Sequence, residues 1–295
     1  MVGPGLPRRI AFIGFGLIGG SIAKALRRSD PSIELRAWTP AGHGPAVGLR
    51  LGLLDELDPT PEATLDGAGL VVLAGPPLAV LGSLADLSGA RRQHLMPGVT
   101  ITDVASTKGA IVAAAGALGL RFVGGHPMAG REATGVEAST PDLFVGRPWV
   151  VVPGSGAGSD DVARVEALAL AVGARPVRLA AEAHDRAVAA ISHLPLVVAV
   201  ALVEAVAGGA DWPTASDLVA SGWGDMTRLA RGDPEMGAGI LATNAVEVAG
   251  RLRDLRNALD AWIGALDGGP ARPDADALRD RLAGARARLD ADRRP

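Results

Sequence analysis

RIAFIGFGLIGGS, residues 9–21, joins a short apolar run to a glycine-rich turn and then to the start of a helical pattern. In a strand–turn–helix unit of this kind, Gly14 allows the tight turn and Gly16 lets the backbone approach a pyrophosphate. Gly19 lets the helix pack close to the strand, and the N-terminus of that helix faces the phosphates. The stretch therefore predicts a dinucleotide-binding site at the first strand of the chain.

The pattern that begins there continues along the first 180 residues, where short apolar runs alternate with helical patterns. This alternation is typical of a parallel sheet covered by helices. We expect strands at residues 9–13, 33–38, 70–74, 99–103, 121–124, 148–152 and 175–179, and helices at 20–28, 78–87, 108–118 and 160–172.

The strand patterns stop after residue 181, and apolar helical patterns replace them. We expect helices at 183–207, 214–220, 234–250 and 252–266, and a charged helix at 275–290. The predicted fold class is α/β: an N-terminal Rossmann-type doubly wound sheet (residues 1–181) with a C-terminal all-α dimerisation domain (182–295). Helices this apolar in a domain this small need a second copy to bury them, so we expect a homodimer.

Composition narrows the classes of partner. The 295 residues carry a net charge of −3, which gives no electrostatic support for a nucleic-acid partner or an acidic membrane. The chain has no cysteine, which removes disulfides, thiolate nucleophiles and cysteine-based zinc sites, and we expect no metal. The N-terminus lacks the apolar region of a signal peptide, and apolar stretches such as 194–203 are too short to span a bilayer. These features predict a cytoplasmic protein.

The choice of dinucleotide is usually made at the end of the second strand, where Asp or Glu binds the ribose 2′-hydroxyl. This sequence has Thr39 at that position, so no carboxylate is present there to repel a 2′-phosphate. NADP is therefore slightly favoured over NAD, with His43 and Arg50 as the next basic groups along the chain. The residues expected at the cofactor are Gly14, Gly16, Leu17, Ile18, Gly19, Thr39 and Pro76.

Polar side chains follow two other predicted strands. Ser106 and Lys108 come just after the strand at 99–103, and His126 comes just after the strand at 121–124. Because ligands bind at the carboxyl ends of parallel strands, these residues are candidates for an active site. Enzymes that oxidise an alcohol need a base for the hydroxyl proton, and histidine is the usual choice near neutral pH.

Five motifs in order give the chain a resemblance to the prephenate/arogenate dehydrogenases of tyrosine biosynthesis over about residues 9–266. They are GFGLIGGS (14–21), DVASTK (103–108), GHPMAGREATG (125–135), HDRAVAAISHLP (184–195) and GDMTRLARGDPEMG (224–237). The resemblance implies that NAD(P)+ takes hydride from C4 of a cyclohexadienol while the ring carboxylate leaves as CO2. Prephenate would give 4-hydroxyphenylpyruvate, and arogenate would give tyrosine.

The resemblance also implies residue roles. His126 is similar to the family's base or hydrogen-bond partner of the ring hydroxyl, and Ser106 to the serine that binds that hydroxyl and orients the histidine. Arg228 is similar to the arginine that binds a substrate carboxylate, a role suited to a permanently charged fork. Lys108 stands at the family's lysine position, and Ser192 and His193 are expected to border the substrate pocket, His193 equally well as a structural residue.

The sequence leaves the substrate's side chain open. Leu196 stands where many prephenate-using members have a second histidine, and Trp223-Gly224-Asp225 replaces a common Phe-Arg-Asp. These departures, with Thr39 and the PEMG ending, favour an arogenate-using, NADP-tolerant enzyme, whereas Glu132 matches prephenate-using members and is a further candidate for the substrate pocket.

The residues present oppose two other interpretations. A non-catalytic dinucleotide-sensing dimer would not need Ser106, His126 and Arg228 together. A two-domain dehydrogenase of the β-hydroxyacid type would need a catalytic lysine after the Rossmann domain, and no lysine follows Lys108.

Overall fold

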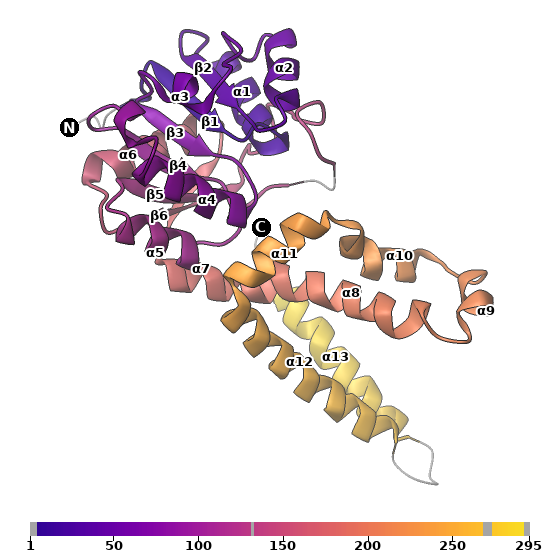
Figure 1. Ribbon diagram of the computed structural model, residues 1–295. Helices are drawn as coiled ribbons and strands as arrows, with labels where there is room; N and C mark the ends of the chain where they lie inside the picture. The colour runs from indigo at the N-terminus through magenta and orange to yellow at the C-terminus, as the bar shows by residue number, and fades with distance from the viewer. Residues whose placement is uncertain (1–4, 131–132, 268–272, 292–295) are drawn as a thin grey trace. The chain divides into compact units, whose positions relative to one another are not determined.

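The computed structural model describes residues 5–130, 133–267 and 273–291, and Figure 1 shows the course of the chain. The chain divides into two compact units, residues 1–248 and 249–295. The first unit is built on a seven-stranded sheet of order β2-β1-β3-β4-β5-β6-β7. Its strands are β1 (Arg9–Ile13), β2 (Glu34–Trp38), β3 (Leu70–Leu73), β4 (Thr100–Asp103), β5 (Phe122–Pro127), β6 (Pro148–Pro153) and β7 (Arg175–Arg178). The predicted Rossmann-type sheet is confirmed.

Two strands, β6 and β7, run opposite to the parallel set β1 to β5 and so depart from the expected parallel order. β6 pairs with β5 antiparallel, with His126 opposite Val150, and β7 then pairs with β6 in parallel. A parallel connection needs a crossover of a dozen or more residues, usually a helix. The connection between β5 and β6 carries no helix among its described residues, and the chain returns in the opposite direction.

Helices cover both faces of the sheet, as in other doubly wound folds. On one face, α1 (Leu17–Ser29) buries Ile22 and Leu26 in a core shared with β1, β2 and β3. On the same face, α6 (Ser159–Ala171) packs over β4 to β7 and adds Val165 and Leu168 to that core. On the other face, α4 (Pro77–Ser88) and α5 (Gly109–Ala117) share a core with β3, β4 and β5. Three short helices complete this region: α2 (His43–Arg50), α3 (Pro61–Leu65) and η1 (Arg92–His94).

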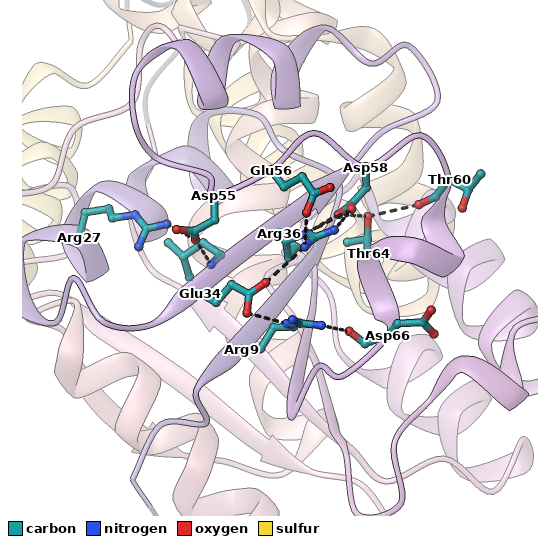
Figure 2. A network of polar contacts seen from close by, with 11 residues as sticks. Arg9, Arg27, Glu34, Arg36, Asp55, Glu56, Asp58, Thr60, Thr64 and Asp66 are labelled. Atoms are coloured by element: carbon teal, nitrogen blue, oxygen red, sulfur yellow. Dashed lines mark hydrogen bonds and ion pairs between the residues drawn. The ribbon is translucent and has the colours of Figure 1, made fainter.

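A network of ion pairs fastens the edge strand β2 to the segment that follows it, as Figure 2 shows. Arg36 of β2 donates through Nε to both carboxylate oxygens of Asp58, at 3.1 and 2.9 Å, and its guanidinium also pairs with Glu34 and Glu56. Thr64 donates to Asp58 as well, at 2.9 Å, and the Asp58 side chain is only 1% exposed. Because β2 ends at Trp38, this network also fixes the start of the loop that carries Thr39.

A long helix follows β7. α7 (Ala181–Val188), the π-helical turn η2 (Ala189–His193) and α8 (Leu194–Ala207) run on without a break. Pro195 has no N–H to bond to the carbonyl four residues earlier, which is a common reason for a helix to widen locally. π-helical turns of this kind occur frequently at functional sites.

This 27-residue helix is long and apolar enough to cross a membrane by length and composition, so the expectation that every apolar stretch is too short is wrong. The reason is that the mostly apolar residues 187–193 precede residues 194–203 in the same helix. In the most apolar 18-residue stretch of this helix, only 22% of the residues are buried within the chain.

Two further expectations about helices are corrected. Residues 214–220 do not form one helix: α9 (Trp212–Ser216) ends before α10 (Ser221–Thr227), and η3 (Arg228–Arg231) follows. α10 and η3 pack against α8. The helix expected at 234–250 is interrupted at Asn244, so that α11 (Pro234–Thr243) and α12 (Ala245–Leu266) are separate. Asn244 leaves helical geometry because its side chain bonds inward, to the carbonyl of Asp185.

The second unit consists of residues 249–266 of α12 together with α13 (Ala275–Ala291). Arg281 of α13 donates to the carbonyls of Ala258 and Ala261 at 3.1 and 2.9 Å. Its guanidinium also lies 4.0 Å from the ring centroid of Trp262, a cation–π contact.

The β2 network yields a stability prediction. Asp58→Asn removes a buried carboxylate from Arg36, and breaking a buried ion pair costs about 3–5 kcal/mol. We expect the lower end of that range in the free energy of unfolding, measured by urea denaturation, because Arg36 keeps Glu34 and Glu56. Glu56→Gln is the control, since Glu56 contacts the same guanidinium but is 65% exposed, and it should cost less than about 1 kcal/mol. Equal losses in the two variants would contradict this account.

Candidate active site

The glycine-rich turn after β1 has the geometry that a dinucleotide requires. Gly14 has φ +94°, and a Cβ there would lie 2.7 Å from the carbonyl carbon and oxygen of Ala74. Gly16 precedes α1, no side chain caps that helix, and a Cβ at Gly16 would meet nothing within 4 Å. The open side of the turn therefore presents backbone N–H groups of the helix N-terminus, including those near Leu17 and Ile18. Gly19 is buried within α1, and a Cβ at Gly19 would lie 3.6 Å from the Cβ of Ala74.

A cavity of about 390 Å³ adjoins this turn at the carboxyl ends of β1, β2 and β3. Its lining includes Gly14 and the expected Pro76, together with Trp38, Pro40 and Ala79. The cavity is mostly apolar in lining and concave, as nucleotide sites are. The glycine turn, the uncapped helix and the cavity together fit a bound dinucleotide.

Thr39 lies just beyond β2, and its side chain is used locally. Its Oγ1 accepts a hydrogen bond from the backbone N–H of Gly42 at 3.1 Å. His43, one of the two basic groups considered for a 2′-phosphate, pairs through Nε2 with Glu137 at 3.1 Å. A carboxylate thus stands beside His43, although it comes from a segment 94 residues further along the chain.

His126, the predicted base, lies in the last residues of β5 and contacts a second histidine. Its Nδ1 is 2.8 Å from Nε2 of His184 in α7, and the two rings meet edge to face with centroids 5.1 Å apart. His184 in turn places Nδ1 2.7 Å from Oδ1 of Asp185. His126 is half-buried, and no hydrogen bond to its Nε2 is found among the described residues.

Asp185 accepts from more than His184. Its Oδ1 and Oδ2 accept from the backbone N–H groups of Lys108 and Gly109, each at 2.8 Å, at the start of α5. Burial raises the pKa of Asp185, but the hydrogen bonds from His184 and from these two amides outweigh it and leave the pKa below its usual value. Asp185 is therefore a carboxylate near neutral pH.

The surroundings keep His126 neutral. Burial lowers the pKa of His126 well below its ordinary value, and His184, Lys108 and His193 lower it further. A neutral imidazole has one bare nitrogen, which is what a general base needs.

Lys108 is fully buried and pairs with Asp103 at the end of β4, so its ammonium is not exposed to a substrate in this structure. Asp103 also accepts from the backbone N–H groups of Gly125 and Ala105, at 3.0 and 3.1 Å. Burial raises the pKa of Asp103 and lowers the pKa of Lys108, and each partner opposes the shift of the other. The Lys108–Asp103 pair is thus a buried part of the site, and Asp103 bonds to the backbone of Gly125, the residue before His126.

The other residues predicted to bind the substrate form no hydrogen bond with His126 or His184 in the parts of the chain that the structure describes. Ser106 lies on the β4–α5 turn, with no hydrogen bond to His126 among the described residues. Ser192 is exposed in η2, and Arg228 is exposed at the start of η3. Glu132 lies outside the described residues. The roles of these four residues stay predictions.

His193 is buried beside this group, with 1% of its surface exposed. Its Nδ1 lies 3.2 Å from Nδ2 of Asn244, which also donates to the carbonyl of Asp185 at 2.9 Å. Its Nε2 is buried without a hydrogen-bond partner among the described residues. Burial lowers the pKa of His193 to about 4, with His184 lowering it and Asp185 opposing. In the described parts of the chain, no group of three or more His, Asp or Glu could hold a metal ion.

Sequence reasoning missed His184, Asp185 and Asn244, the three residues that connect the site. A partial signal was present in the sequence: His184 and Asp185 are adjacent polar residues just before a long apolar stretch of the same helical pattern. The structure shows that both are buried. Buried polar groups almost always have partners, so such a pair at the start of an apolar helix points to a site.

Two family descriptions match the chain in succession. "Prephenate dehydrogenase, nucleotide-binding domain" matches residues 22–178, and "Prephenate dehydrogenase, dimerization domain" matches residues 180–283. The prephenate dehydrogenase of Bacillus subtilis is 31% identical over 262 residues, which are 88% of this chain and 68% of that protein.

Solved structures agree with the sequence matches. The arogenate dehydrogenase of Synechocystis superposes with a TM-score of 0.77 at 32% identity, covering 95% of this chain and 99% of that one. The prephenate dehydrogenase of Aquifex aeolicus, in complex with hydroxyphenyl propionate and NAD+, has a TM-score of 0.83 at 26% identity, covering 96% and 98%.

The buried His193 gives a pH prediction. Its pKa of about 4 in the folded chain lies below the ordinary value of 6.5, so the unfolded chain binds a proton that the folded chain does not. The free energy of unfolding should therefore fall as the pH is lowered from 6.5 to 4. His193→Gln should make this dependence shallower, because it removes the group whose pKa differs between the folded and unfolded chains. An unchanged slope in His193→Gln would show that another group is responsible.

Proposed function

Because the chain belongs to the prephenate dehydrogenase family, we propose that it oxidises prephenate, arogenate or both and releases the ring carboxylate as CO2, a step of tyrosine biosynthesis. The observation that carries this proposal is the neutral His126, held through Nδ1 by His184 at the end of β5. The chain is an oxidoreductase with a dinucleotide-binding domain.

The proposed chemistry can be written so that atoms balance. The turn at Gly14, Gly16 and Gly19 would hold NAD(P)+, which when bound would accept the hydride from C4 of the ring. His126 takes the proton of the C4 hydroxyl through its bare nitrogen, which leaves a carbonyl at C4. As CO2 leaves, the electrons of the broken C–C bond make the ring aromatic, and His126 returns the proton to the phenolic oxygen. No net proton is released.

The remaining roles are proposed from motif positions. Ser106 binds the ring hydroxyl, and Arg228 binds a substrate carboxylate with the paired geometry of a guanidinium. Ser192, His193 and Glu132 border the substrate. Lys108 acts on His126 and not on the substrate, because its ammonium is buried in the pair with Asp103. Its charge contributes to the low pKa of His126.

We propose a homodimer formed through the helical part, with the domain boundary after residue 181, and a cytoplasmic location. The support is the exposed apolar surface of α8, which an isolated chain leaves in water, and the match to a dimerization domain. A second copy of the chain is the occupant that accounts for both observations.

For the cofactor, we propose that NADP+ is accepted at least as well as NAD+. The support is Thr39, which has no charge to repel a 2′-phosphate. Glu137 works against this preference, because it pairs with His43 and places a negative charge beside a group that could bind the 2′-phosphate.

Assays of the chain with prephenate and arogenate, each with NAD+ and NADP+, test the function directly. Reduced cofactor should form with at least one combination. Replacing His126 with Asn should lower kcat by about 10²–10⁴-fold, the usual contribution of a general base, and should leave NAD(P)H binding nearly unchanged. Near-normal turnover in His126→Asn would rule out His126 as the base.

Cofactor preference is tested by kcat/KM for both cofactors with one substrate. Thr39→Asp should shift the preference towards NAD+, because it adds a ribose acceptor and a repulsive charge. Glu137→Gln should raise kcat/KM for NADP+ and leave that for NAD+ unchanged. A tenfold or greater preference of the wild type for NAD+ would contradict the proposal for Thr39.

Light scattering at micromolar concentration should find a dimer. Val200→Glu places a charge on the apolar surface of α8 and should give monomers. Leu170→Glu is the matched control, since Leu170 is an exposed apolar residue of α6 in the nucleotide-binding part, and it should stay dimeric. A monomeric wild type would refute the dimer.

A further inference from the structure

We propose that His184 and Asp185 are positioning residues that fix the tautomer of His126, with the proton on Nδ1 and Nε2 left bare towards the substrate. Neither residue touches the substrate in this account. The catalytic consequence rests on the proposed function of His126 as a base, whereas the tautomer itself can be tested without any substrate.

The chain of hydrogen bonds that reaches His126 starts at the carboxylate of Asp185. Its two oxygens lie 2.8 Å from the backbone nitrogens of Lys108 and Gly109, and backbone N–H groups can only donate. Both oxygens are therefore acceptors. The same Oδ1 lies 2.7 Å from Nδ1 of His184, so that nitrogen must carry a hydrogen and donate it.

In a neutral imidazole one nitrogen donates and the other accepts, and the positioning role requires His184 in this form. With its hydrogen on Nδ1, His184 has a bare Nε2. That atom lies 2.8 Å from Nδ1 of His126, which must then be the donor. A neutral His126 with hydrogen on Nδ1 has a bare Nε2, the form needed to accept a hydroxyl proton.

Three donors besides His184 hold Asp185 in place, and they give the chain of hydrogen bonds a fixed starting point. The start of α5 supplies two donors, and Asn244 donates to the backbone carbonyl of Asp185 at 2.9 Å. Gly109 is needed for this approach, because a Cβ there would lie 2.9 Å from Oδ2 of Asp185. Thr107 and Thr243, whose hydroxyls are 2.8 Å apart, fasten the same turn to α11.

A purely structural role is the rival explanation, since Asp185 also satisfies the N-terminus of α5. The two roles are separable at His184, which does not contact α5 through a hydrogen bond. His184→Gln keeps a side-chain oxygen that can accept from His126, whereas His184→Leu removes every acceptor. Both variants leave the Asp185 contacts to Lys108 and Gly109 unchanged.

The first experiment is ¹⁵N NMR of the imidazole nitrogens at neutral pH on full-length protein labelled in histidine. The chain has five histidines, so single-histidine variants assign the signals. We expect His126 and His184 in the wild type to be protonated on Nδ1 and bare on Nε2. In Asp185→Asn, an amide N–H can face His184 and reverse both tautomers, as a wrong-tautomer substitution does in a catalytic triad.

The second experiment is kinetic. His184→Leu and Asp185→Asn should lower kcat by about 10²-fold or more, with KM changed far less, because a misplaced tautomer removes the base without removing substrate contacts. His184→Gln should recover at least tenfold in kcat over His184→Leu. NAD(P)H binding, followed by fluorescence, should be equal in all variants and shows that they are folded.

The outcomes separate the two proposals. A wild-type His126 protonated on Nε2, or equal kcat in His184→Gln and His184→Leu, overturns the positioning role. If the tautomers are as expected but His126→Asn turns over normally, the positioning stands as structure and the proposed base fails.

Discussion

The carboxylate of Asp185 joins three parts of the chain that are distant in sequence. It accepts from the start of α5, it fixes His184 of α7, and through His184 it reaches His126 at the end of β5. A buried polar network of this kind stabilises one arrangement only if each member has its partner, and Asn244 supplies the remaining bond at the carbonyl of Asp185. The first turn of the long helix therefore cannot move relative to the β4–α5 turn without breaking these bonds, and the position of His126 depends on that constraint.

The sheet brings the two halves of the site to the same edge. β1 and β5 belong to the parallel set, so the glycine turn after β1 and His126 at the end of β5 both lie at its carboxyl side. The glycine turn adjoins the apolar cavity, and His126 is surrounded by groups that hold it neutral. One edge can thus hold a dinucleotide beside a group that accepts a hydroxyl proton, which is the combination that alcohol oxidation requires.

Much of this arrangement could be predicted from the sequence because local patterns determine it. The spacing of Gly14, Gly16 and Gly19 and the seven apolar runs predict the sheet and its phosphate turn, and strand ends predict the edge where His126 lies. Other features depend on contacts between distant residues. The direction of β6 follows from a connection without a helix, Glu137 meets His43 across 94 residues, and Asn244 ends α11 because its side chain bonds to a different helix. No local pattern carries these contacts, and for the same reason the partnership of His126 with His184 was missed.

The central claim is that oxidation at the ring carbon and loss of the ring carboxylate are one coupled reaction at His126. Substrate labelled with ¹³C in the ring carboxylate tests it, with CO2 and reduced cofactor measured in the same wild-type reaction. The account predicts one labelled CO2 for each reduced cofactor, at every time point. Reduced cofactor without CO2, or CO2 without reduced cofactor, would contradict it.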